Sequence, residues 1–160
     1  MKARRPSRLK TFNYKGKHRY FVSCATEARR KLLIDSDVVT ALSDQILRTC
    51  AERAFTVIAY VFMDDHIHLL VEGHSEDSHF VSMMTLLRQR TAIAYRRLTR
   101  ERLWQEGYYE RVLRPKDDVF GIIEYIRSNP SNAGLRPERS EYPYVFTKTD
   151  GDSDNRSARL

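Results

Sequence analysis

The stretch Val57–Glu72, which reads VIAYVFMDDHIHLLVE, indicates how the chain around it folds. Two runs rich in β-branched and aromatic residues flank the polar pair Asp64-Asp65, a pattern that predicts a hairpin of strand, turn and strand. Because successive side chains of a strand point to opposite faces, we expect His66 and His68 on one face, about 7 Å apart. At that separation both imidazoles can reach one metal ion. Taken alone, the pair is equally consistent with two half-exposed histidines on the polar face of an antiparallel strand.

The composition of the 160 residues predicts one soluble globular domain, long enough to bury a core and too short for two. No apolar run approaches the roughly 20 residues that span a bilayer, and the N-terminus lacks the apolar core of a secretory signal. We therefore expect a cytoplasmic protein that does not bind a membrane. The cysteines, Cys24 and Cys50, have no metal-ligand spacing and fit a reducing compartment.

The net charge of +7 is concentrated at the N-terminus. Eight of the 28 lysines and arginines lie within residues 1–26, which contain none of the 21 acidic residues. A basic arm beside a nearly neutral body is typical of proteins that bind the phosphates of DNA or RNA. A solubilising tail and an arginine-rich transit peptide are the alternatives.

Hydrophobic spacing and turn residues predict an α+β protein, with one antiparallel sheet and helices packed against it. The predicted elements are a strand at 19–25, a helix from residue 35 or 36 to about 50, the hairpin, a helix at 78–100, a strand at 108–113 and a third helix. The residue before a proline is pushed out of helical geometry, so the third helix should end at Asn129-Pro130.

The apolar residues of the last two helices predict which side chains enter the core. In the second helix, the expected core stripe is Phe80, Met83, Met84, Leu87, Ala94 and Leu98. In the third helix, the expected inward residues are Val119, Phe120, Ile122, Ile123 and Ile126.

Gly121, Tyr125 and Asn129 form a stripe beside the apolar face of the third helix. Residues four apart are neighbours on a helix surface, so the Tyr125 hydroxyl and the Asn129 carboxamide can meet one object. Gly121 leaves space beside the ring, which is one reason to keep a glycine inside a helix. The alternative is a boundary tyrosine followed by a C-capping asparagine.

Three motifs in this order and spacing resemble the single-tyrosine transposases of the HUH (histidine-hydrophobe-histidine) superfamily, and in particular the REP-associated branch. The motifs are YVFMDDHIHLLV at Tyr60–Val71, Trp104-Gln105-x-Gly107-Tyr108-Tyr109-x-Arg111, and Tyr125-Ile126-x-x-Asn129-Pro130-x-x-Ala133-Gly134-Leu135. A late Tyr142-Pro143-Tyr144 is similar to the aromatic tail motif of that family. The resemblance covers residues 12–146, which is most of the chain.

The resemblance implies a ferredoxin-like sheet flanked by helices. It implies that His66, His68 and Asn129 bind Mg²⁺ or Mn²⁺ and that Tyr125 is the nucleophile. Such an enzyme cuts single-stranded DNA at hairpin-forming ends of an element, keeps a 5′ phosphotyrosine and transfers the strand. The residues expected to bind DNA are Arg4, Arg5, Arg8, Lys10, Lys15, Lys17, Arg19, Arg88 and Arg111. The expected organisation is a basic arm at 1–18, the catalytic domain at 19–147 and a polar flexible tail at 148–160.

Several alternatives remain open at this point. Asp64 stands where the family usually has proline, and it is either a turn residue or an extra carboxylate near the metal. Tyr108 and Tyr109 are other tyrosines, but neither has an asparagine four residues later. The rival functions are a domesticated protein that binds DNA without cutting it and a metal hydrolase that needs no tyrosine. A monomer is slightly favoured over a homodimer.

Overall fold

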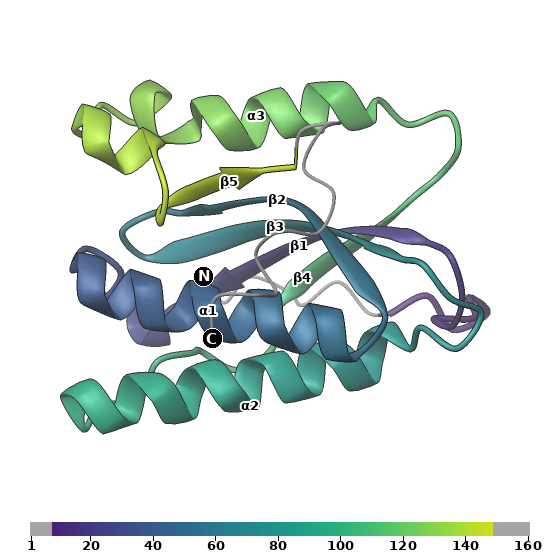
Figure 1. Cartoon of the computed structure of the whole chain (residues 1–160), viewed down its shortest axis with the longest axis horizontal. Coiled ribbons are helices and arrows are strands. Elements are labelled where there is room, and N and C mark those ends of the chain that lie inside the picture. Colours follow the sequence, from purple (N-terminus) through teal and green to yellow (C-terminus); the bar gives the residue numbers. More distant parts are fainter. Residues whose placement is uncertain (1–7, 149–160) are drawn as a thin grey trace.

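Five antiparallel strands form one sheet in the order β4-β1-β3-β2-β5, and helices cover both of its faces (Figure 1). The structure is a computed structural model, and it describes residues 8–148. Arg4, Arg5 and the predicted tail beyond Lys148 lie outside the described residues. The elements are β1 (Arg19–Ala25), α1 (Ser36–Glu52), β2 (Phe55–Phe62), β3 (His66–Gly73), α2 (Phe80–Thr99), β4 (Tyr109–Leu113), α3 (Val119–Asn132) and β5 (Val145–Thr147), with short 3-10 helices at Glu27–Arg29 and Pro137–Ser140.

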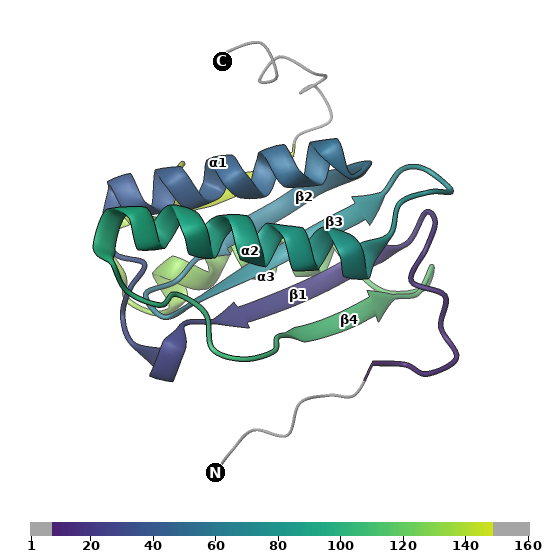
Figure 2. The same cartoon turned by 90° about the horizontal axis from the view of Figure 1, so that it is seen from below.

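The molecule has three layers, with α1 and α2 below the sheet and α3 above it (Figures 1 and 2). The order β4-β1-β3-β2, with both crossover helices on one face, is the ferredoxin-like arrangement, so the predicted fold class is confirmed. Strand β5 was not predicted, because three residues are too few to show an alternating pattern. It pairs with β2 through Val61↔Val145 and extends the sheet beneath α3.

The hairpin forms as predicted, between β2 and β3. Its register pairs Val61 with His68 and Phe62 with Ile67, and Met63 N donates to His66 O at 2.8 Å across the turn. Ile67, Leu69 and Val71 join the core under α1 and α2, so His66 and His68 face α3. A register shift of one residue would move every side chain of β3 to the other face and bury both imidazoles under α1 and α2. The burial of Ile67, Leu69 and Val71 therefore also fixes the face on which the histidines lie.

The core stripe of α2 differs from the prediction at its C-terminal end. The first four expected residues are buried: Phe80, Met83, Met84 and Leu87. The stripe then continues through Thr91 and Tyr95, whereas Leu98 is 56% exposed and was wrongly assigned to the core. Thr91 is polar but satisfied, because its hydroxyl accepts a hydrogen bond from Trp104 Nε1 at 2.9 Å. That partner lies 13 residues away and outside the helix, so helical periodicity could not predict it.

The third helix also departs from the prediction at both ends. Phe120 is 72% exposed rather than buried, because it lies about 200° around the helix from Ile122, which faces the sheet. Pro130 lies inside α3 and does not end it. The Pro130 carbonyl accepts from Leu135 N at 3.0 Å, and Gly134 adopts a left-handed φ of 72°, so the helix closes with a glycine turn after Asn132.

Within residues 8–148, no helix is long and apolar enough to cross a membrane. Residues 8–18, which belong to the predicted basic arm, contact the body of the protein. Gly16 N donates to Ser78 O at 2.9 Å, and the rings of Phe12 and Tyr14 pack against the core.

Candidate active site

His66 and His68 stand side by side on the α3 face of the sheet. Their ring centroids are 4.7 Å apart, and His68 is only 8% exposed. Burial, and secondly the neighbouring His66, lowers the pKa of His68 to about 4, so this ring is neutral at pH 7. Its Nδ1 is buried and has no hydrogen-bond partner within residues 8–148. A neutral imidazole with an unsatisfied nitrogen is the form that binds a metal.

Asp65 orients the first of the two histidines. Its Oδ1 lies 2.6 Å from His66 Nδ1, and its Oδ2 lies 3.8 Å from the Arg29 guanidinium. When His66 carries its proton on Nδ1, it donates to Asp65, and Nε2 keeps its lone pair for a ligand. From the sequence, Asp65 was predicted only as a residue of the hairpin turn. Its position directly before the histidine was the available signal.

Asp64 points to a different part of the molecule. Its Oδ1 accepts from Arg139 at 2.9 Å, and the buried Arg139 also donates to Leu33 O at 3.1 Å. Asp64 therefore connects the hairpin turn to the 3-10 helix at Pro137–Ser140. Of the two roles considered for it, the geometry supports the structural one.

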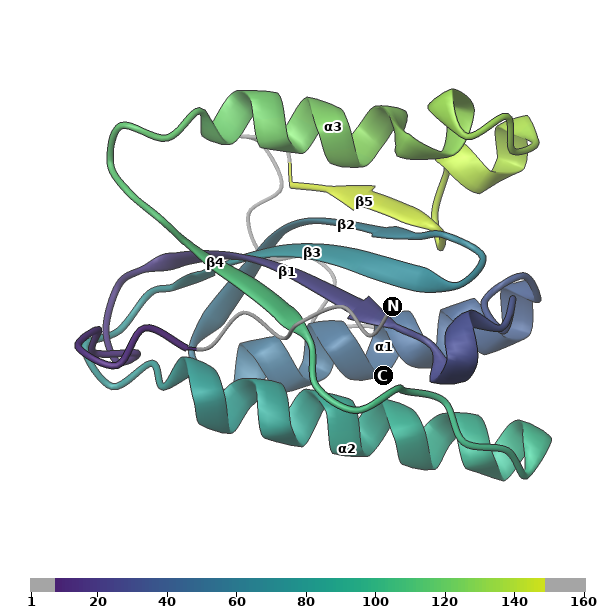
Figure 3. The same cartoon turned by 180° about the vertical axis from the view of Figure 1, so that it is seen from behind.

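Tyr125 lies across from the histidine pair, on α3. Its ring is 50% exposed, and its centroid is 5.6 Å from that of His68. Helix α3 runs antiparallel to β3 on this face, with its C-terminal end at the hairpin turn (Figure 3). The four residues from Tyr125 to Asn129 advance about 6 Å, which matches the step of about 7 Å from His68 back to His66. We therefore expect the half-buried Asn129 to lie level with His66.

These residues fit a divalent metal with open coordination positions. Within residues 8–148, no cluster of three or more His, Cys, Asp or Glu side chains could hold an ion. On this face the two imidazoles offer nitrogen donors, and the Asn129 amide is the oxygen donor that the motif predicts. Such a set leaves positions for water and for substrate oxygens.

A pocket of about 440 Å³ opens beside Tyr125, and we call it the tyrosine pocket. It is lined by Phe21, Arg111, Asp118, Gly121, Ile122 and Tyr125. Asp118 caps α3, since its Oδ1 accepts from Gly121 N at 2.9 Å. A Cβ on Gly121 would collide with that carboxylate, so the glycine allows both the cap and the pocket. Neither Phe21 nor Asp118 was predicted as a site residue, because neither lies within one of the three motifs.

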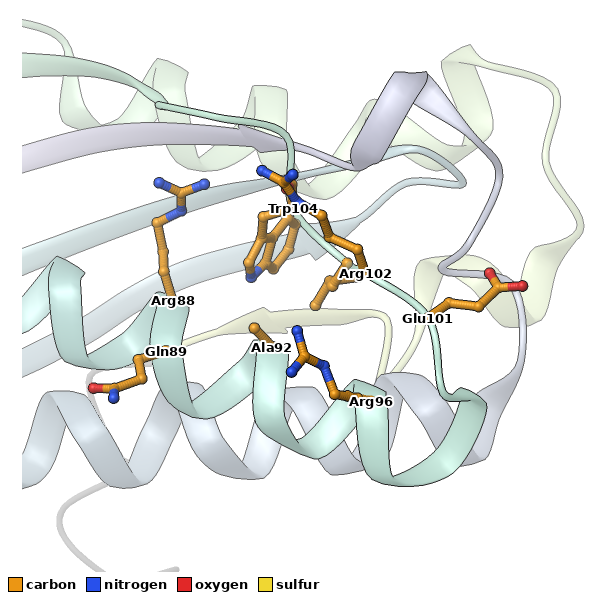
Figure 4. A pocket seen from close by; sticks show the side chains of 8 residues that line it. Arg88, Gln89, Ala92, Arg96, Glu101, Arg102 and Trp104 are labelled. Carbon is orange, nitrogen blue, oxygen red and sulfur yellow. The ribbon is translucent and has the colours of Figure 1, made fainter.

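A second pocket, also about 440 Å³, lies between α2 and residues 101–104, and we call it the arginine pocket (Figure 4). It is lined by Arg88, Gln89, Ala92, Arg96, Glu101, Arg102, Leu103 and Trp104. Helix α2 covers the face of the sheet opposite to α3, so this pocket is separated from the histidine pair by the sheet. Arg88 donates to Gln105 O at 2.6 Å.

The residues expected to bind DNA do not form one surface. Arg8 and Arg88 lie on the α2 side, and both contact the Tyr108 ring, with guanidinium carbons 5.9 and 5.4 Å from its centroid. Arg19 and Arg111 lie on the α3 side, since they pair across the strands with Glu72 and Phe21. Lys10 and Lys17 are exposed.

Several of these cations already have an acidic neighbour. The ion pairs are Arg8–Glu110 at 3.8 Å, Lys15–Asp77 at 3.2 Å, Arg19–Glu72 at 3.0 Å and Arg111–Asp117 at 3.1 Å. Lys15–Asp77 and Arg19–Glu72 are exposed pairs, which contribute about 0–1 kcal/mol, so a phosphate can replace the acidic partner there. Of the two arginines on the α3 side, Arg111 lines the tyrosine pocket together with Tyr125, and Arg19 does not.

Comparisons with known proteins place this geometry in a family. Residues 14–129 match the family described as "Transposase IS200 like". A Haemophilus influenzae protein assigned as a REP-associated tyrosine transposase is 23% identical over 136 residues, which span 78% of this chain and 77% of the relative.

Two solved structures share the fold. A REP-associated tyrosine transposase bound to a REP hairpin superposes with a TM-score of 0.68 at 22% identity, over 88% of this chain and 82% of that one. A Deinococcus radiodurans protein assigned as a transposase superposes with a TM-score of 0.54 at 21% identity, over 76% of this chain and 96% of that one. The chain therefore belongs to the IS200-like transposase family of enzymes, and the relation to the REP-associated tyrosine transposase branch that its motifs predict is confirmed.

Proposed function

We propose that the protein is a metal-dependent, site-specific endonuclease and strand transferase for single-stranded DNA. The observation that carries this proposal is the position of Tyr125, whose ring lies 5.6 Å from the buried, neutral ring of His68. A phenol beside a pair of potential metal ligands is the arrangement that attack on a phosphodiester requires. A protein that only binds DNA needs none of these groups.

In the proposed reaction, the Tyr125 oxygen attacks the phosphorus of the scissile phosphodiester. A bond forms between that oxygen and phosphorus, the bond from phosphorus to the 3′ oxygen breaks, and the released strand takes up a proton as a 3′ hydroxyl. The 5′ end remains on Tyr125 as a phosphotyrosine. The 3′ hydroxyl of a second strand reverses the step and joins the DNA, so no nucleotide cofactor is consumed.

We propose His66, His68 and Asn129 as the ligands of a bound Mg²⁺ or Mn²⁺. When bound, a divalent cation withdraws charge from the phosphate oxygens, and its charge favours the phenolate form of a nearby tyrosine. Asp65 keeps the His66 ring in the orientation and tautomer that a ligand needs. The amide oxygen suits these hard cations, although an imidazole pair would also accept Zn²⁺.

The proposed substrate is a hairpin-forming single strand at the end of a mobile or repetitive element. The solved relative bound to a REP hairpin supports this choice of partner. Arg111 and the exposed basic residues of the arm would hold backbone phosphates. Tyr125 and both histidines come from one chain, which supports a monomer as the active unit. The free, buried Cys24 and Cys50 suit the cytoplasm.

A cleavage assay with a labelled library of single-stranded hairpins and Mn²⁺ tests the proposal. Wild-type protein should form a protein–DNA adduct that resists boiling in detergent. Tyr125→Phe and His66→Ala should form none, whereas Tyr109→Phe, which alters another exposed tyrosine, should retain it. Tight binding without any adduct would favour the domesticated binding protein. Cleavage by Tyr125→Phe would instead indicate a hydrolase that uses water.

A further inference from the structure

The tyrosine pocket is continuous with the site of cleavage, which constrains what can enter it. Tyr125 forms one wall, so a DNA strand whose phosphate meets the Tyr125 hydroxyl brings a neighbouring nucleotide close to the pocket. The volume of about 440 Å³ is within the range of pockets that hold small ligands. An unpaired base from the cleaved strand is therefore the natural occupant, and this step rests on the proposed function.

The walls of the pocket suit a base and its phosphate. The Phe21 ring is held in place by His68, with centroids 5.3 Å apart and planes 26° apart, and it is 6.4 Å from the Tyr125 ring. Aromatic rings of this kind stack unpaired bases whatever their sequence. Arg111 adds a guanidinium whose side chain is 51% exposed and therefore accessible to a phosphate. Neither residue distinguishes one base from another.

Asp118 supplies the group that can distinguish bases. Its Oδ1 accepts a hydrogen bond from Gly121 N. Within residues 8–148, no group donates a hydrogen bond to its Oδ2. A carboxylate accepts hydrogen bonds and cannot donate them. It therefore attracts the exocyclic amino groups of cytosine, adenine and guanine and repels the O4 of thymine or uracil.

We propose that the tyrosine pocket binds one unpaired base next to the scissile phosphate, stacked on Phe21, and that Asp118 selects a base with an exocyclic amino group. Cytosine and uracil give the sharpest comparison. They have the same ring size and differ at position 4, where one carries an amino group and the other a carbonyl oxygen.

The test measures adduct formation on hairpin substrates that carry cytosine or uracil at each position flanking the cleaved bond. A wild-type adduct on at least one substrate establishes the proposed function independently of base choice. At one flanking position, wild-type protein should then react about 10-fold or more faster with cytosine, since a good base contact discriminates by about 1–3 kcal/mol. Asp118→Asn should lose or reverse this preference, because an amide can donate to O4. Asparagine caps helices as well as aspartate does, so α3 should remain folded, as a melting curve by circular dichroism would verify.

Two further variants separate the proposal from general charge effects. Glu124→Gln makes the same change of charge on α3, but Glu124 pairs with Arg127 and does not line the pocket, so its base preference should match wild type. Phe21→Leu should weaken binding of both substrates about 5- to 100-fold while the ratio between them stays constant. An equal rate on cytosine and uracil at both positions, or a cytosine preference that persists in Asp118→Asn, would overturn the proposal.

Discussion

The tyrosine pocket and the arginine pocket have the same volume, about 440 Å³, but they lie on opposite faces of the sheet and have different surroundings. The tyrosine pocket adjoins Tyr125, which is the proposed nucleophile, the neutral ring of His68 and the capping carboxylate of Asp118. The arginine pocket is lined by guanidinium groups, the Glu101 carboxylate and the buried ring of Trp104 (Figure 4), and the sheet separates it from the histidine pair. Size therefore says little about function here, and the chemistry of the neighbouring side chains separates a catalytic surface from a binding or structural one. Four predictions test this difference, from the largest expected effect to the smallest.

The largest effect should come from His68, beside the tyrosine pocket. His68→Ala should lower the rate of adduct formation by about 1000-fold or more, because charge stabilisation by a metal is worth several kcal/mol. A quench-flow or gel assay with excess DNA measures that rate. The arginine-pocket variant Gln89→Ala serves as the control and should react at the wild-type rate. Equal rates for His68→Ala and wild type would show that the histidine pair does not take part in adduct formation.

The next effect concerns stability and the arginine pocket. Trp104→Ala should lower the free energy of unfolding by about 3–5 kcal/mol, because it removes a 5% exposed ring and leaves the buried Thr91 hydroxyl without its donor. Phe120→Ala removes a ring that is 72% exposed and should change stability by less than about 0.5 kcal/mol. Urea denaturation followed by circular dichroism compares the two. A small loss in Trp104→Ala would mean that this pocket is not part of the core.

Replacing Asp65, which contacts His66 on the α3 face of the sheet, should have an intermediate effect on metal affinity. Asp65→Asn should lower the affinity for Mn²⁺ by about 10- to 100-fold, because the amide no longer fixes the His66 tautomer. Calorimetric titration of the free protein measures this directly and needs no DNA. Asp64→Asn should retain the affinity for Mn²⁺ and lower stability instead, since Asp64 pairs with Arg139. The reverse pattern would show that Asp64 is the residue that supports the metal.

The smallest effect should come from Arg96, which lines the arginine pocket and forms no ion pair within the described part of the chain. If DNA reaches this face, Arg96→Ala should weaken binding only a few-fold and lower the slope of log affinity against log salt by about 1. Arg97→Ala, a neighbouring exposed arginine outside the pocket, is the control. A change in the cleavage rate of DNA that is already bound would contradict a binding role for this pocket.

Much of this protein follows from local chemistry that the sequence displays. Alternating apolar residues place His66 and His68 on one face of β3, and a side-chain cap at Asp35 starts α1 where it was expected. The three motifs, in their order and spacing, predicted the family without reference to the fold, and the family match over residues 14–129 confirms it. These features were predictable because each depends on residues a few positions apart, which hydrogen-bond or alternate in ways that any strand or helix imposes.

The rest depends on contacts between distant residues. Leu98 and Phe120 are exposed because their helices turn other faces to the core, and Pro130 stays inside α3 because its carbonyl and Gly134 form the closing turn. Asp64 pairs with Arg139, which lies 75 positions away in the sequence. Phe21 and Arg111 line one pocket with Tyr125 only because α3 lies over the face of the sheet on which β1 and β4 carry these two side chains. The sequence by itself determined the reactive groups and the faces they occupy. Only the tertiary structure decided which of them share a pocket, because that depends on how the layers pack and not on the spacing of residues along the chain.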